Sequence, residues 1–179
     1  TLAWTLLLLV SLHVAGVLSL PEAIRIVWQR GRIMQHATGL GRMASVGISP
    51  AEATELLGPY GDRLSLAAIN APRSVVLSGE GDALESLLAD LAGRGVSHRM
   101  LPVDYAFHSA QMAPFQRLLA IELGDVRTSA PRIELYSTVT GAVARQARYD
   151  AAYFGRNVRE TVRLASAVGA MASEGFNVF

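Results

Sequence analysis

Residues 43–103 read MASVGISPAEATELLGPYGDRLSLAAINAPRSVVLSGEGDALESLLADLAGRGVSHRMLPV, and this stretch decides the fold. Met43 to Ile48 is an apolar run that predicts a strand. The following Ser49-Pro50-Ala51-Glu52 predicts a helix start, since serine caps helices well and proline suits their first turn. That helix is expected to reach Leu57, where Gly58-Pro59-Tyr60-Gly61 breaks the pattern.

Two more strands and a second helix complete this stretch. Strands are predicted over 64–69 and 74–77, joined by a turn at Asn70-Ala71-Pro72-Arg73. A helix over 82–92 places its leucines on one face, and a last strand follows over 96–103. The order strand-helix-strand-strand-helix-strand is that of a ferredoxin-like βαββαβ unit.

The flanking segments predict an α/β layer that this compact unit interrupts. Helices are expected over 21–36 and 112–123, a strand over 133–138, and two helical stretches after it. The chain is therefore divided into residues 1–41 and 104–179 of a large subdomain and residues 42–103 of a small one. The apolar start and the strand-like Asn177-Val178-Phe179 indicate a piece of a larger domain.

Residues 1–20 carry no Asp, Glu, Lys or Arg, and Leu6 to Val10 is wholly apolar. About twenty such residues are enough to span a bilayer. No basic segment precedes them and His13 interrupts them, which favours a buried core helix. Both interpretations stay open from the sequence, with the core helix preferred.

Composition excludes several function classes. The 179 residues are 51% hydrophobic and 17% charged with a net charge of +1, which predicts a folded domain without the electrostatic footprint of a nucleic-acid binder. All sixteen basic residues are arginine, so a lysine Schiff base and a P-loop lysine are excluded. The absence of cysteine excludes disulfides and thiolate chemistry and fits a cytoplasmic location. The histidines show no metal-ligand spacing, so no metal is expected.

Two candidate groups stand out. His108, in Asp104-Tyr105-Ala106-Phe107-His108-Ser109, lies between a strand and a helix, where general bases are often presented, although a capping role is the simpler interpretation. Arg30 and Arg32 flank Gly31 and suit a carboxylate ligand, or are ordinary surface arginines. Gly39-x-Gly41-x-x-Ala44 matches a dinucleotide fingerprint, which needs a strand before it and a helix after it. Here a helix precedes it and a strand follows, so no dinucleotide site is predicted.

Assembled in order, these stretches resemble the acyltransferase domain of modular polyketide synthases and, more distantly, malonyl-CoA:acyl-carrier-protein transacylases. The matching segments are His13–Leu20, Arg30–Met34, Ala67–Gly79, Val103–Ser109, Tyr136–Gly141 and Tyr153–Arg159. The resemblance implies a partial α/β-hydrolase-like large subdomain with an inserted ferredoxin-like small subdomain.

The resemblance also implies a ping-pong acyl transfer. A serine attacks the thioester of malonyl-CoA or a 2-substituted malonyl-CoA, and the acyl group then passes to the phosphopantetheine thiol of an acyl carrier protein. Carried over, His108 is the general base and Arg30 binds the free carboxylate. No cofactor bound by the domain itself is expected, a membrane partner is not favoured, and an adjacent ketosynthase domain is an expected partner.

Substrate selectivity is carried in this family by the segment matching Tyr105-Ala106-Phe107-His108. Malonyl-selective relatives have His-Ala-Phe-His and methylmalonyl-selective ones Tyr-Ala-Ser-His. Phe107 would crowd a 2-methyl branch and favours malonyl, whereas Tyr105 is the residue found in methylmalonyl-selective relatives. One methyl group is worth only about 1–3 kcal/mol in a pocket, and malonyl is preferred.

One departure from the family is serious. The Gly-His-Ser-x-Gly nucleophile elbow falls on Ala3-Trp4-Thr5-Leu6-Leu7, so threonine stands at the serine position and both glycines are lost. The chain alone is therefore expected to lack transacylase activity. The alternatives are a non-catalytic binding remnant that contacts a carrier protein or a neighbouring synthase domain and, last, a membrane-tethered module.

Overall fold

The computed structural model describes residues 2–145 and 148–177, and side chains from residue 7 onward. The helices and strands, in chain order, are α1 (Leu2–Val14), α2 (Leu20–Gln35), β1 (Arg42–Val46), α3 (Pro50–Leu57), the 3₁₀ helix η1 (Gly58–Arg63), β2 (Leu64–Ala71), β3 (Ser74–Gly79), α4 (Gly81–Gly93), β4 (His98–Met100), the 3₁₀ helix η2 (Ala110–Met112), α5 (Ala113–Leu123), β5 (Tyr136–Ser137), β6 (Ala142–Val143), α6 (Ala151–Arg159) and α7 (Leu164–Ser173).

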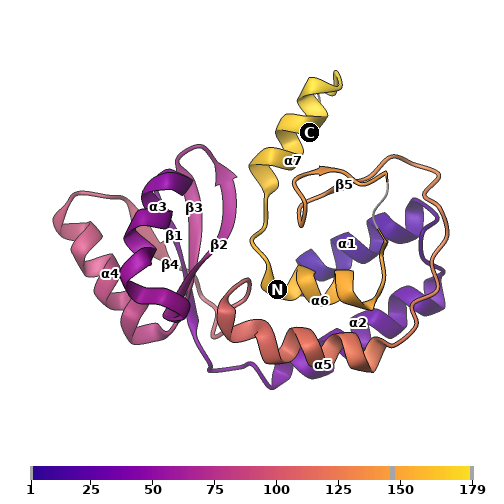
Figure 1. Cartoon of the computed structure of the whole chain (residues 1–179), viewed down its shortest axis with the longest axis horizontal. Helices are drawn as coiled ribbons and strands as arrows, with labels where there is room; N and C mark the ends of the chain where they lie inside the picture. The colour runs from indigo at the N-terminus through magenta and orange to yellow at the C-terminus, as the bar shows by residue number, and fades with distance from the viewer. Residues whose placement is uncertain (1, 146–147, 178–179) are drawn as a thin grey trace.

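Strands β1 to β4 form one antiparallel sheet in the order β2-β3-β1-β4. With α3 after β1 and α4 after β3, the predicted βαββαβ order is present. In Figure 1 this sheet and its two helices lie at one side, and α1, α2, α5 and α6 gather at the other. The mixed α/β class predicted from the sequence is confirmed, while the boundaries at 42 and 103 and the hydrolase-like nature of the flanking segments stay predictions.

Alternation along the strands separates two cores. Val75 and Leu77 of β3 pack with α3 and α4, whereas Val76, from the opposite face, packs with the helical side of the molecule. Because side chains alternate across a strand, the sheet divides one apolar cluster from the other. The sheet therefore serves as a wall against which the helical region is built.

The start of helix α3 shows how residues close in sequence determine where a helix begins. The Ser49 side chain accepts a hydrogen bond from the Glu52 backbone N–H, and the Glu52 carboxylate accepts one from the Ser49 N–H. This is a complete capping box, with Pro50 in the first turn. The helix starts where the sequence predicts.

Two predicted strands are much shorter than expected. The strand expected over 96–103 is limited to β4, because Leu101 makes the last backbone bond to Met43 and Pro102 has no N–H to continue the pairing. The strand expected over 133–138 is only β5, which turns back at Gly141 (φ +74°) to pair with β6. The expected strand at 177–179 falls largely on residues 178–179, outside the described residues.

Helix α1 answers the question posed by the apolar start. Leu9 and Leu12 are buried in the core with residues of α2, whereas Leu7 and Val10 are exposed. Among the described residues, no helix has both the length and the apolar character needed to cross a membrane. The face of α1 that carries Leu9 and Leu12 is therefore part of the core, as the core-helix interpretation predicts.

Candidate functional site

His108 occupies a strained position after β4. It is the one described non-glycine residue with positive φ, at 59°, a conformation that normally costs of order 1 kcal/mol. Two hydrogen bonds hold it there: its backbone N–H donates to the Val158 carbonyl (3.0 Å), and its ring Nδ1 lies 2.9 Å from the Glu160 carbonyl oxygen. Such strain, fixed by its surroundings, is typical of functional positions.

The partner of Nδ1 sets the tautomer of this imidazole. A carbonyl oxygen can only accept, so Nδ1 carries the proton and Nε2 keeps a free lone pair. The pKa of His108 is lowered to about 4: burial is the main cause, the hydrogen bond to Glu160 opposes it, and the Arg30 charge adds a smaller lowering. At neutral pH the ring is uncharged, as a general base must be. The other three histidines are exposed.

Arg30 lies on α2, far from His108 in sequence. Its Nη1 donates to the Asn157 side-chain oxygen of α6 at 2.5 Å. Burial lowers the pKa of Arg30 to about 10, which still leaves it charged at neutral pH. None of the ion pairs between described residues includes Arg30. A charged, partly buried guanidinium with only a neutral partner is suited to binding a carboxylate from a ligand.

The sequence singled out Arg30 and Arg32 together, and the structure separates them. Arg32 is exposed, pairs with Glu122 at 2.7 Å and lies over the Trp28 ring. It is therefore a satisfied surface residue of α2. The simpler interpretation holds for Arg32 and not for Arg30.

Tyr105 and Phe107 pack beside His108. Their rings are stacked with centroids 4.9 Å apart, and the Phe107 ring lies 6.4 Å from the imidazole. Phe107 is buried and Tyr105 is half-buried. The two aromatic side chains predicted to shape selectivity thus stack on each other beside His108.

Sequence reasoning missed the element that joins these groups. Asn157 and the carbonyls of Val158 and Glu160 all belong to the end of α6. The segment Tyr153–Arg159 was recognised as part of the family pattern, but without a role for Asn157. A backbone carbonyl leaves no signal in the sequence at all.

Thr5 is the residue at the expected nucleophile position. Its backbone lies inside α1, and its side chain is outside the described residues. A nucleophile elbow needs a tight turn between strand and helix. Residue 5 lies instead within a continuous helix.

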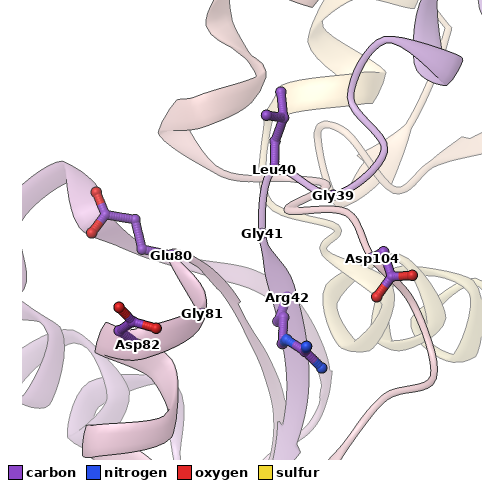
Figure 2. A pocket seen from close by; sticks show the side chains of 8 residues that line it. All are labelled: Gly39, Leu40, Gly41, Arg42, Glu80, Gly81, Asp82 and Asp104. Atoms are coloured by element: carbon purple, nitrogen blue, oxygen red, sulfur yellow. The ribbon is translucent and has the colours of Figure 1, made fainter.

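A pocket of about 420 Å³ lies elsewhere, between the connection from α2 to β1, the start of α4 and Asp104. Figure 2 shows Glu80 and Asp82 on one side of it, Asp104 on the other and Arg42 between them. It contains neither Arg30 nor His108. Among residues 2–145 and 148–177 no group of three or more candidate ligands is placed to hold a metal ion.

Comparison with known proteins decides the family. Residues 9–179 match the family model described as the acyl transferase domain. The chain belongs to the acyl transferase domain family. The predicted resemblance to acyltransferase domains of polyketide synthases is confirmed by the relatives described next.

This acyl transferase domain is 42% identical over 167 residues to erythronolide synthase EryA2 of Saccharopolyspora erythraea and 44% identical over 167 residues to the spectinabilin polyketide synthase system protein NorA' of Streptomyces orinoci. Each match covers 93% of the chain and 5% of the relative. The chain thus spans a small part of the synthases it matches.

Solved structures agree in fold. The acyltransferase domain from the second module of the salinomycin polyketide synthase has a TM-score of 0.87 at 40% identity, covering 93% of this chain and 39% of that one. A loading acyltransferase from the avermectin modular polyketide synthase also has a TM-score of 0.87, at 34% identity, covering 93% and 54%.

Proposed function

We propose that the site formed by Arg30 and His108 is the carboxylate-binding and proton-accepting part of a malonyl-type acyl transfer. One observation carries this proposal: the same helix end holds a neutral imidazole with a free Nε2 and a charged guanidinium that has no carboxylate partner among the described residues. Arg30 would bind the distal carboxylate through two parallel hydrogen bonds. That carboxylate does not react, so its binding orients the thioester.

In the proposed transfer, His108 handles one proton. As a hydroxyl attacks the thioester carbon, Nε2 accepts the hydroxyl proton. When the tetrahedral intermediate collapses, the C–S bond breaks and the departing CoA sulfur takes that proton. A second attack, by the phosphopantetheine thiol of a carrier protein, repeats the exchange in reverse and regenerates the hydroxyl. Acyl-CoA is thus a substrate and phosphopantetheine belongs to the partner.

The component missing from this proposed site is the serine of a nucleophile elbow. The printed sequence contains no Gly-x-Ser-x-Gly motif, and residue 5 lies within α1. We therefore propose that the chain alone binds malonyl-type groups without turning them over. The helical setting of residue 5 also favours the second candidate function, a non-catalytic module that contacts a carrier protein or a neighbouring synthase domain such as a ketosynthase. A cytoplasmic location stays a prediction.

The acyl group is proposed to be malonyl. The Phe107 ring, buried beside His108, leaves less room for a 2-methyl branch than serine would. A related acyltransferase domain, SpnD, 32% identical, was solved in complex with 2-(pent-4-yn-1-yl)malonyl. That relative shows a substituted malonyl group on this fold, so the preference here rests on Phe107.

Calorimetric titration with malonyl-CoA and acetyl-CoA tests the proposal. Only malonyl-CoA carries a carboxylate for Arg30, so it should bind more tightly, and Arg30→Ala should remove the difference. The exposed Arg32→Ala is the matched control and should leave the preference intact. Equal binding of the two thioesters by the unmodified chain would contradict the assignment.

Intact mass spectrometry after incubation with malonyl-CoA or methylmalonyl-CoA tests whether any residue of the chain becomes acylated. No covalent adduct is expected from either. A malonyl adduct that disappears in Thr5→Ala would show that threonine attacks and would overturn the proposed lack of turnover.

A further inference from the structure

Residues 157–162 connect three parts of the molecule. The Asn157 side chain reaches Arg30 on α2, and the carbonyls of Val158 and Glu160 hold His108. Two residues later the backbone pairs with β2, since the Val162 N–H donates to the Ala67 carbonyl at 2.9 Å. One short segment thus fixes the guanidinium and the imidazole, and ties both to the sheet.

Helix α6 is held by packing that does not depend on a ligand. The Asp150 side chain caps its start by accepting from the Tyr153 N–H at 2.8 Å, and Phe154 and Val158 are fully buried. A Cβ at Gly155 would lie 3.0 Å from the Gln116 carbonyl oxygen, which shows how closely α6 approaches α5. Asn157 therefore presents its amide from a rigid support.

The chemistry of the amide matters as much as its place. A carboxylate here would also hold the guanidinium, but it would cancel the charge that a substrate carboxylate needs. An amide oxygen accepts the hydrogen bond and leaves the full positive charge on Arg30. Orientation and charge are thereby supplied by different residues.

We propose that Asn157 is a positioning residue that orients Arg30 for a ligand carboxylate while leaving its charge uncompensated, and that the end of α6 sets Arg30 and His108 as one unit. This inference rests on the proposed function, because it assigns Asn157 a task only if Arg30 binds a carboxylate. Asn157 itself touches neither substrate nor reacting atoms in this account.

Two substitutions separate orientation from charge. Asn157→Ala removes the hydrogen bond that orients the Arg30 guanidinium but leaves its charge, and should weaken malonate binding about ten-fold. Asn157→Asp keeps the shape and the hydrogen bond but pairs the guanidinium, so malonate binding should fall at least as far. Asn70→Asp, on an exposed residue of β2, is the matched control and should bind malonate normally.

A second readout distinguishes positioning from general damage to the fold. The Arg30 charge lowers the pKa of His108, so neutralising it in Asn157→Asp should raise that pKa, whereas Asn157→Ala, which keeps the charge, should not. NMR titration of the labelled imidazoles measures this, with His108→Gln identifying the resonance. A merely structural role for Asn157 would lower the thermal midpoint of both variants without this difference.

The two proposals fail in different ways. If the unmodified chain binds malonate no better than Arg30→Ala does, the proposed function fails. If Arg30→Ala abolishes binding but both Asn157 variants bind as the unmodified chain does, the positioning role alone is overturned. Because Asn157→Asp is isosteric, it tests the inference even if Asn157→Ala does not fold.

Discussion

The four-stranded sheet with α3 and α4 and the segments that carry Arg30 and His108 are built by different rules. In the sheet region, apolar side chains alternate along the strands and helices begin at caps, so each element is marked by residues close together in the sequence. The pairing of these strands is less local, because β1 lies between β3 and β4. In the site region, a histidine with φ of 59° is held by a helix that lies about fifty residues later in the chain. The helices and strands of the first region are therefore marked by local signals, whereas the proposed site of the second depends on contacts between distant segments.

The largest effect is expected from opening a cavity in the sheet region. Leu84 of α4 is fully buried beneath the sheet, so Leu84→Ala should lower the free energy of unfolding by about 3 kcal/mol. Leu118→Ala, on a leucine of α5 that is 41% exposed, is the control and should cost much less. Urea unfolding measures both. Similar losses from the two variants would break the distinction between core and surface.

Acid should act through the site region. Because the pKa of His108 is about 4 when folded, against 6.5 for an ordinary histidine, the unfolded chain binds this proton at higher pH. The free energy of unfolding should therefore fall as pH drops from about 6.5 to 4, by on the order of 2 kcal/mol.

Urea unfolding across this pH range checks the prediction, with His108→Gln expected to flatten the slope. The exposed His98→Gln should leave it unchanged. An unchanged slope in His108→Gln would place the acid sensitivity elsewhere in the molecule.

Backbone strain at position 108 gives a smaller effect. Since glycine adopts positive φ without penalty, His108→Gly should be more stable than His108→Ala by about 1 kcal/mol. At an ordinary helical position alanine is the more stable of the two, as an Ala/Gly pair at exposed Glu85 of α4 should show. If alanine is the more stable residue at both positions, the positive φ of residue 108 is contradicted.

The smallest effect is expected at the cap of α3. Ser49→Ala removes one half of the capping box and should cost about 1 kcal/mol or somewhat less in unfolding free energy. Ser86→Ala, on the exposed face of α4, is the control and should be near neutral. Thermal unfolding distinguishes the two variants, and equal midpoints would show that the Ser49 cap does not stabilise the fold.

The same contrast explains what the sequence could predict. The βαββαβ order follows from residues close together in the chain, such as Ser49 with Glu52 and the leucines of α4. The length of β4 was overestimated, because Pro102 ends the pairing within a stretch that is otherwise typical of a strand.

The motifs single out His108 and Arg30 as candidate site residues, but they do not predict what surrounds either side chain. Within the described part of the chain, Arg32 pairs with Glu122 from ninety residues away, whereas Arg30 takes part in no ion pair. The Glu160 carbonyl that fixes the imidazole tautomer is a backbone atom, so no residue type marks it. Contacts of this kind are set by tertiary packing, which local patterns do not encode.

The most direct test of the central claim is the pKa of His108 measured by NMR with and without saturating malonate. If Arg30 and His108 form one site, a carboxylate bound to the guanidinium cancels a charge that opposes protonation, and the pKa should rise above its value of about 4. The rise should be absent in Arg30→Ala. A His108 pKa that does not move while malonate is bound would contradict the joint site.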